Sequence, residues 1–114
     1  MDYGYRPLPP DRLLSFISRK YIEYKKGGAS TVSAADMAIS SVNKAMAKSR
    51  FNRALIYRYL MILTEDHQNT EFYHRMVHLY DVANNHLSNE EEKSILNIIN
   101  NFNLNKDQLK RGNE

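Results

Sequence analysis

The chain has 114 residues and a formal net charge of +3, and 42% of its residues are hydrophobic, which predicts one folded domain with a single core. The absence of cysteine excludes disulfides and thiolate-bound metals. The longest apolar run, residues 60–63, is far shorter than the roughly 20 residues of a membrane span, and residues 1–10 lack the apolar segment of a signal peptide. We therefore expect a cytoplasmic protein with no membrane span.

Residues 1–10 are rich in proline, which restricts the backbone and predicts an extended arm. Asp11 is expected to cap a first helix that runs to about Lys26, where Gly27 and Gly28 end it. One face of this helix is apolar, and it carries Leu13, Leu14, Ile17, Tyr21 and Tyr24.

Ser33 is expected to cap a second helix that runs to about Lys48, followed by a short turn over residues 49–52 and a third helix to about Asp66. The second helix is expected to bury Met37, Ala38, Val42, Ala45 and Met46. The third is expected to bury Leu55, Ile56, Tyr59, Leu60 and Leu63.

Thr70 is expected to cap a fourth helix ending near Asn84–Asn85. Its buried stripe would carry Tyr73, Met76, Val77, Tyr80 and Leu87. The run from Ser88 to Glu91 is a capping box, S-x-x-E, which predicts the start of a last helix. Its inward residues would be Ile95, Ile98, Ile99 and Phe102.

These elements predict an all-α fold, a compact bundle of four or five short helices. A single helical domain over residues 11–104 would lie between the Pro-rich arm at 1–10 and a frayed polar tail at 105–114. No alternating pattern bounded by hairpin turns indicates strands.

Charge is unevenly distributed along the chain. Residues 1–60 carry 11 Lys/Arg and 4 Asp/Glu, a balance of +7, whereas residues 61–114 carry 5 and 9, a balance of −4. Such a split can steer association with nucleic acid, with an acidic protein or with a second copy of the chain. Solvated helix faces explain it equally well.

A basic cluster surrounds the expected turn between the second and third helices. An outward basic face on the second helix of a helix–turn–helix can enter the major groove of DNA, and the same face suits an acidic protein. Two or three arginines give DNA only a modest, salt-sensitive affinity. The expected interaction surface consists of Lys44, Lys48, Arg50, Arg53, Tyr57 and Arg58.

Glu71, His74 and His78 share one stripe of the fourth helix. Histidine and carboxylate at this spacing can bind zinc, but the pattern H-E-x-x-H is absent and Arg75 opposes a cation. The stripe lies roughly 160° from the expected buried face. We therefore expect no metal and an exposed surface, which would be pH-sensitive if a partner covered it.

No Gly-rich phosphate loop or G-x-S-x-G motif is present. No serine stands at a sequence spacing from a potential general base that indicates a catalytic pair. We therefore assign no catalytic residue and no cofactor, and expect a protein that is not an enzyme.

The stretch from Ala34 to Ala83 resembles the small all-helical enterobacterial YmgB/AriR regulators. The matching positions are Ile39, Val42, Asn52, Arg53, Ile56, Leu60, Leu63, Glu65 and Tyr73. The resemblance implies a dimeric, non-enzymatic regulator tied to biofilm or stress signalling. The long first helix and the helix after Ser88 depart from that family.

The run from His86 to Lys93, followed by Ile95, Ile98 and Ile99, resembles the last helix of bacteriocin immunity proteins, which are small cytoplasmic four-helix bundles. We therefore expect a small bacterial regulatory or adaptor protein that acts by protein–protein contact, with DNA contact through the basic surface and homodimer formation left open. The alternatives are an immunity protein that neutralises a toxin and a helix–turn–helix-like nucleic-acid-binding protein.

Overall fold

The structure of the protein, a computed structural model, describes residues 8–112, of which 104–112 are described by their backbone alone. Residues 1–7 of the expected arm lie outside the described residues. The described part contains helices and no strand, so the predicted all-α class is confirmed. Its elements are α1 (Pro10–Lys26), α2 (Thr31–Ser40), α3 (Arg50–Leu63), a 3₁₀ turn η2 (Glu65–His67), α4 (Glu71–Asn84) and α5 (Asn89–Gly112).

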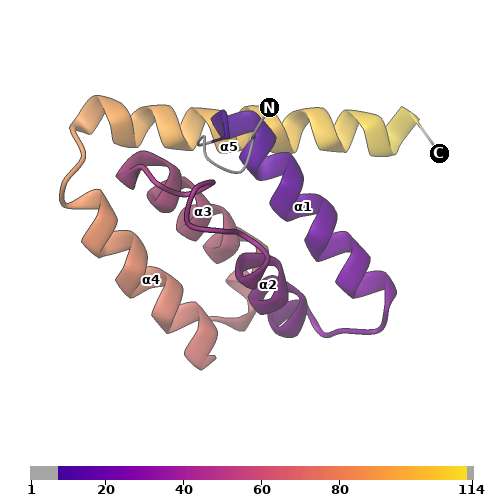
Figure 1. Ribbon diagram of the computed structural model, residues 1–114. Coiled ribbons are helices and arrows are strands. Elements are labelled where there is room, and N and C mark those ends of the chain that lie inside the picture. The colour runs from indigo at the N-terminus through magenta and orange to yellow at the C-terminus, as the bar shows by residue number, and fades with distance from the viewer. Residues whose placement is uncertain (1–7, 113–114) are drawn as a thin grey trace.

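Helix α3 lies at the centre of the bundle and packs on each of the other four helices. Helices α1 and α2 lie on one side of it and α4 on the other, while α5 runs along the top of the bundle in this view and packs on α1 and α3 (Figure 1). Because neighbouring helices cover α3 on several sides, its side chains are buried around most of its circumference. It contributes the buried residues Asn52, Ala54, Leu55, Ile56, Tyr59 and Leu60.

Helix α1 begins at Pro10, and Asp11 lies in its first turn without capping it. Proline suits the first helical position because its fixed φ is already helical and its missing N–H would have no partner there. The predicted end is confirmed: the N–H of Gly28 donates to the Lys25 carbonyl and that of Ala29 to the Tyr24 carbonyl. Gly28 has φ +102°, a left-handed conformation that favours glycine in this helix-ending motif.

The predicted limits of α2 are wrong at both ends. Ser30 is the N-cap, because its Oγ accepts from the backbone N–H of Ser33, which places Ser33 at the third helical position. The helix ends at Ser40, well before Lys48. The predicted turn at 49–52 is also misplaced, since Ser49 caps α3, which begins at Arg50.

The predicted starts of α4 and α5 are confirmed. The Thr70 hydroxyl accepts from the backbone N–H of Tyr73. At the capping box, the N–H of Ser88 donates to Glu91 Oε1 at 2.9 Å, and the N–H of Glu91 donates to Ser88 Oγ at 3.1 Å. Helix α5 is described through Gly112, so its backbone is helical over much of the segment expected to fray.

The buried faces are only partly as predicted. In α2 the buried residues are Ala34, Ala35 and Ala38, while Met37 is 38% exposed. In α4 they are Phe72, Met76, Tyr80 and Ala83, whereas Tyr73 and Val77 are half-buried. The aromatic ring of Phe102 meets Tyr59 edge to face, with centroids 5.8 Å apart. These packing contacts join α3 to α4 and α5 in one core.

Candidate protein-binding groove

The segment of residues 41–49, which connects α2 to α3, is fixed against the rest of the protein by Asn52. This side chain is 5% exposed. Its Nδ2 donates to the Leu8 carbonyl at 3.1 Å and to the Met46 carbonyl at 3.3 Å. One amide group therefore joins the segment before α1, the connection and the first turn of α3.

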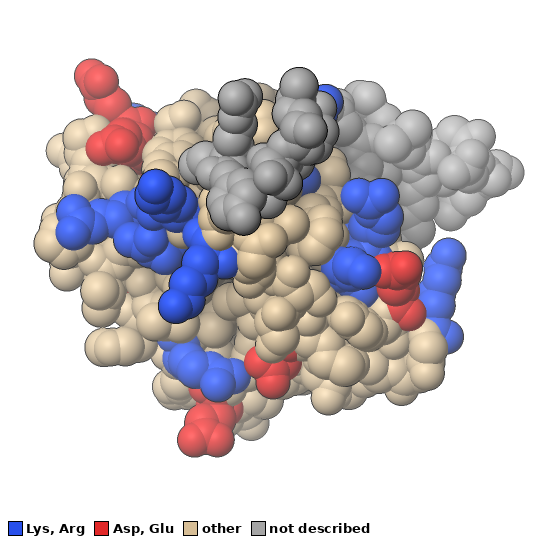
Figure 2. Space-filling model, in the orientation of Figure 1, with Lys and Arg blue, Asp and Glu red and all other residues tan. Residues whose placement is uncertain are grey.

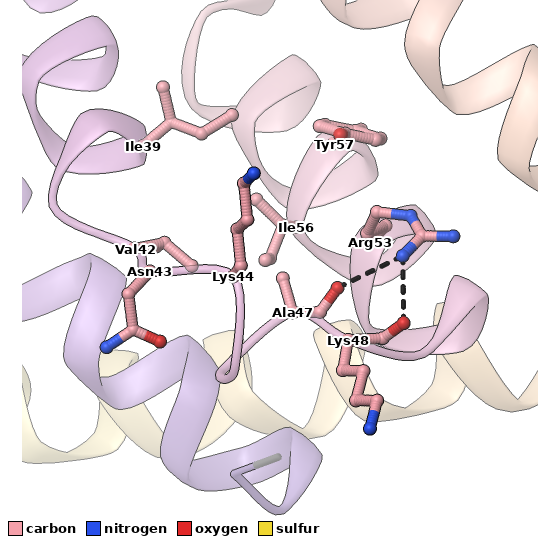
Figure 3. Close-up of a pocket in the computed structure, with 9 residues that line it drawn as sticks. All are labelled: Ile39, Val42, Asn43, Lys44, Ala47, Lys48, Arg53, Ile56 and Tyr57. Atoms are coloured by element: carbon pink, nitrogen blue, oxygen red, sulfur yellow. Dashed lines mark hydrogen bonds between the residues drawn. The ribbon is translucent and has the colours of Figure 1, made fainter. Parts of the chain in front are cut away.

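Two further side chains order the same connection. Asn43 Oδ1 accepts from the backbone N–H of Met46 at 2.9 Å. Arg53 Nη1 donates to the carbonyls of Ala47 at 3.3 Å and Lys48 at 2.8 Å (Figure 3). The guanidinium group of Arg53 is thus held in place by the backbone of the connection.

A cavity of about 410 Å³ lies between the end of α2, the connection and α3. Its apolar lining consists of Ile39, Val42, Ala47 and Ile56, and its polar lining of Asn43, Lys44, Lys48, Arg53 and Tyr57. Lys44 extends between Ile39 and Ile56, while Lys48 is directed away from them (Figure 3). The site therefore combines an apolar lining with cations.

A second cavity, of about 230 Å³, lies between α3 and α4 and shares Arg53 and Tyr57 with the first. Its other lining residues are Arg50, Leu79, Val82, Ala83 and His86. Val82 is 50% exposed, the highest value among the large apolar side chains in the described part of the chain. We call the two cavities together the α3 groove.

The formally charged side chains that line the α3 groove are all positive. Lys44, Lys48, Arg50 and Arg53 line it, and no described carboxylate does. Figure 2 shows Lys and Arg side chains gathered over this part of the molecule, with acidic side chains at the upper left border of the group. Clefts of one sign attract ligands of the opposite sign, so the groove suits a negatively charged partner.

Arg58 lies apart from the groove, although the sequence grouped it with the basic cluster. Its guanidinium carbon is 5.5 Å from the centre of the Tyr80 ring, and its buried Nε has no hydrogen-bond partner among the described residues. Burial raises the pKa of the Tyr80 phenol, and the Arg58 charge opposes this shift. Arg58 therefore packs onto α4, and five of the six residues of the expected interaction surface line the groove.

Glu71, His74 and His78 are exposed, as expected from the stripe of α4 on which they lie. They border a hollow that also contains Asp36 and Arg75, whose side chains form an ion pair at 3.5 Å. Among the described residues, no group of three histidine or carboxylate side chains is placed to hold a metal.

The sequence did not indicate the apolar lining of the groove or the contribution of α4 to it. Val42 was expected on the buried face of a continuous helix, and neither Val82 nor His86 was singled out. An apolar residue at an exposed helical position, such as Val82, was the available signal.

Comparisons with models of known families, with curated proteins and with solved structures found no match to this chain. Within the described residues, every helix is too short or too polar to cross a membrane.

Proposed function

We propose that the protein is a small, non-enzymatic regulatory or adaptor protein of the cytoplasm that binds a protein partner through the α3 groove. The observation that carries the proposal is the first cavity, where Ile39, Val42 and Ile56 lie beside Lys44 and Arg53. Apolar lining with a few polar groups is typical of sites that hold a ligand side chain. A cationic border adds selectivity for an acidic partner.

A protein partner fits this site better than DNA. The turn of a DNA-binding helix–turn–helix has three or four residues, whereas residues 41–49 separate α2 from α3. Arg58 packs on Tyr80, so its guanidinium group is not free to follow a phosphate backbone. The apolar lining would also gain nothing from phosphates.

Affinity capture from the native host tests this proposal. The bait would be the intact protein, compared with a Lys44→Glu/Lys48→Glu variant and with Lys93→Glu as a control. All three lysines are exposed, so the variants should fold, and Lys93 lines neither cavity. We expect the double variant to bind the captured partner at least about tenfold more weakly, and the control to bind normally.

A parallel measurement with duplex DNA separates the two kinds of partner. DNA binding through this surface would weaken steeply as salt rises and would be lost in the double variant. A protein partner that binds all three baits equally would overturn the proposal, as would salt-sensitive DNA binding with no captured protein.

A further inference from the structure

We infer that the partner presents an acidic segment with two apolar side chains, one for each cavity of the α3 groove, with its carboxylates over the cations. This inference rests on the proposed function and adds the chemistry of the partner. It follows from the shared lining of the cavities, from their charge and from the exposure of Val82.

The two cavities lie on opposite sides of a ridge on α3, which is formed by the side chains of Arg53 and Tyr57. Arg53 and Tyr57 line both, and they stand one turn apart on α3, where side chains share a face. One cavity opens toward Ile39 and Val42 of the α2 side, the other toward Leu79 and Val82 of α4. A segment crossing the ridge would therefore reach both.

The width of α3 sets the spacing of the two apolar side chains. A helix with its side chains is about 10 Å across, so groups inserted on its two sides stand roughly 10 Å apart. A helical partner provides this separation on one face at positions i and i+7. An extended partner, whose successive side chains point to opposite faces, provides the next larger same-face separation, about 13 Å, at positions i and i+4.

The positive charges of the groove indicate that the partner's polar groups are carboxylates. Lys44, Lys48 and Arg50 are exposed and border the groove with Arg53. Arg53 is already fixed by the carbonyls of Ala47 and Lys48, so binding a carboxylate would cost it little side-chain entropy. A partner without acidic residues would leave these cations unpaired.

Selection from a displayed peptide library tests the inference with the full chain as bait. Peptides of about 16 random residues, roughly 24 Å long when helical, are long enough to cross the ridge. Binding of the selected peptides would then be measured by fluorescence anisotropy against purified variants. These are Val82→Glu, Lys44→Glu/Lys48→Glu, and the matched controls Met37→Glu and Lys93→Glu.

Met37 is the appropriate control for Val82. It is the other large apolar side chain that is exposed in the described part of the chain, at 38%, and it lines neither cavity. Circular dichroism would show that each variant keeps the helical content of the wild type.

We expect the selected peptides to be acidic, with two apolar residues at one of the two spacings. Val82→Glu and the lysine double variant should each weaken binding about tenfold or more, and the controls should leave it unchanged. Peptides that depend on the lysines and not on Val82 would overturn the two-cavity inference while leaving the proposed function intact.

Two other outcomes have their own meaning. Peptides that are insensitive to both groove variants, or no selected peptides, would count against the proposed function as well. A dimer in sedimentation analysis that Val82→Glu dissociates would assign the groove to a second copy and overturn the inference.

Discussion

Replacing Asn52 by alanine should lower the free energy of unfolding by about 2–3 kcal/mol. The side chain is 5% exposed, and its Nδ2 donates to the carbonyls of Leu8 and Met46. Each hydrogen bond contributes about 1 kcal/mol net, and a partly buried carbonyl left without its donor adds to the loss. Because Met46 belongs to the connection, the variant should also loosen one wall of the α3 groove.

Thermal and urea unfolding, followed by circular dichroism, would measure this change. For 114 residues the entropy of unfolding is about 0.24 kcal/mol/K. A loss of 2–3 kcal/mol should therefore lower Tm by about 8–12 °C. Such a loss is a large fraction of the roughly 5–15 kcal/mol by which domains are usually stable.

Asn97→Ala is the matched control, because Asn97 is an exposed residue of α5 and alanine is the better helix former. The control should be neutral or slightly more stable than the wild type. At neutral pH, Asn52→Asp should lower the free energy of unfolding more than Asn52→Ala does, because a carboxylate cannot donate a hydrogen bond and would face two carbonyl oxygens. If the free energy of unfolding of Asn52→Ala lies within about 0.5 kcal/mol of that of the control, the two hydrogen bonds do not hold the connection in place.

Three further predictions concern other parts of the fold. Gly28→Ala should lower the free energy of unfolding by about 1 kcal/mol, because the residue has φ +102°, which is unfavourable for alanine even though no atom lies within 4 Å of the added Cβ. An unchanged Tm would contradict this. Ser88→Ala should cost about 1 kcal/mol because the N–H of Glu91 loses its acceptor, whereas the exposed Ser94→Ala in α5 should cost less. Burial raises the pKa of Tyr59 above 10.0, so the stability linked to its neutral phenol is present below about pH 10 and lost as pH rises through the folded pKa. Urea midpoints should therefore fall more steeply above pH 10 in the wild type than in Tyr59→Phe.

Local signals predicted the helices and several of their ends. Thr70 and the capping box at Ser88 act on backbone groups within three residues, so their sequence spacing was sufficient. Ser30 and Ser33 show the limit of such signals, since both can cap and only one begins α2. The choice depends on which start buries Ala34, Ala35 and Ala38 against α1, and packing of this kind is not visible in a local window.

The candidate site was only partly predictable for a similar reason. Lys44, Lys48, Arg50 and Arg53 were grouped because they are close in sequence, and they do lie close together. The contribution of α4 comes from residues more than 20 positions away, which only tertiary packing brings to α3. Arg58 shows the converse. It is close in sequence to the other basic residues, but its position in α3 directs its side chain to Tyr80 and away from them.

The early end of α2 is what forms the groove. Ser40 Oγ donates to the Asp36 carbonyl and Ser41 Oγ to the Met37 carbonyl, bonds that compete with continuation of a helix. In a helix continued to Lys48, the side chains of Lys44 and Lys48 would be stacked on one face. The chain instead turns back toward α3, where Arg53 holds the carbonyls of Ala47 and Lys48.

The same bonds change what the basic cluster can do. An arginine that donates to two carbonyls of its own chain keeps its charge at a fixed place between the two cavities. A fixed charge beside apolar lining favours a ligand with a matching arrangement of carboxylates and apolar groups, because little entropy is lost in ordering the site. This arrangement supports our proposal that the cluster, which resembles a DNA-binding surface in sequence, binds an acidic segment of another protein.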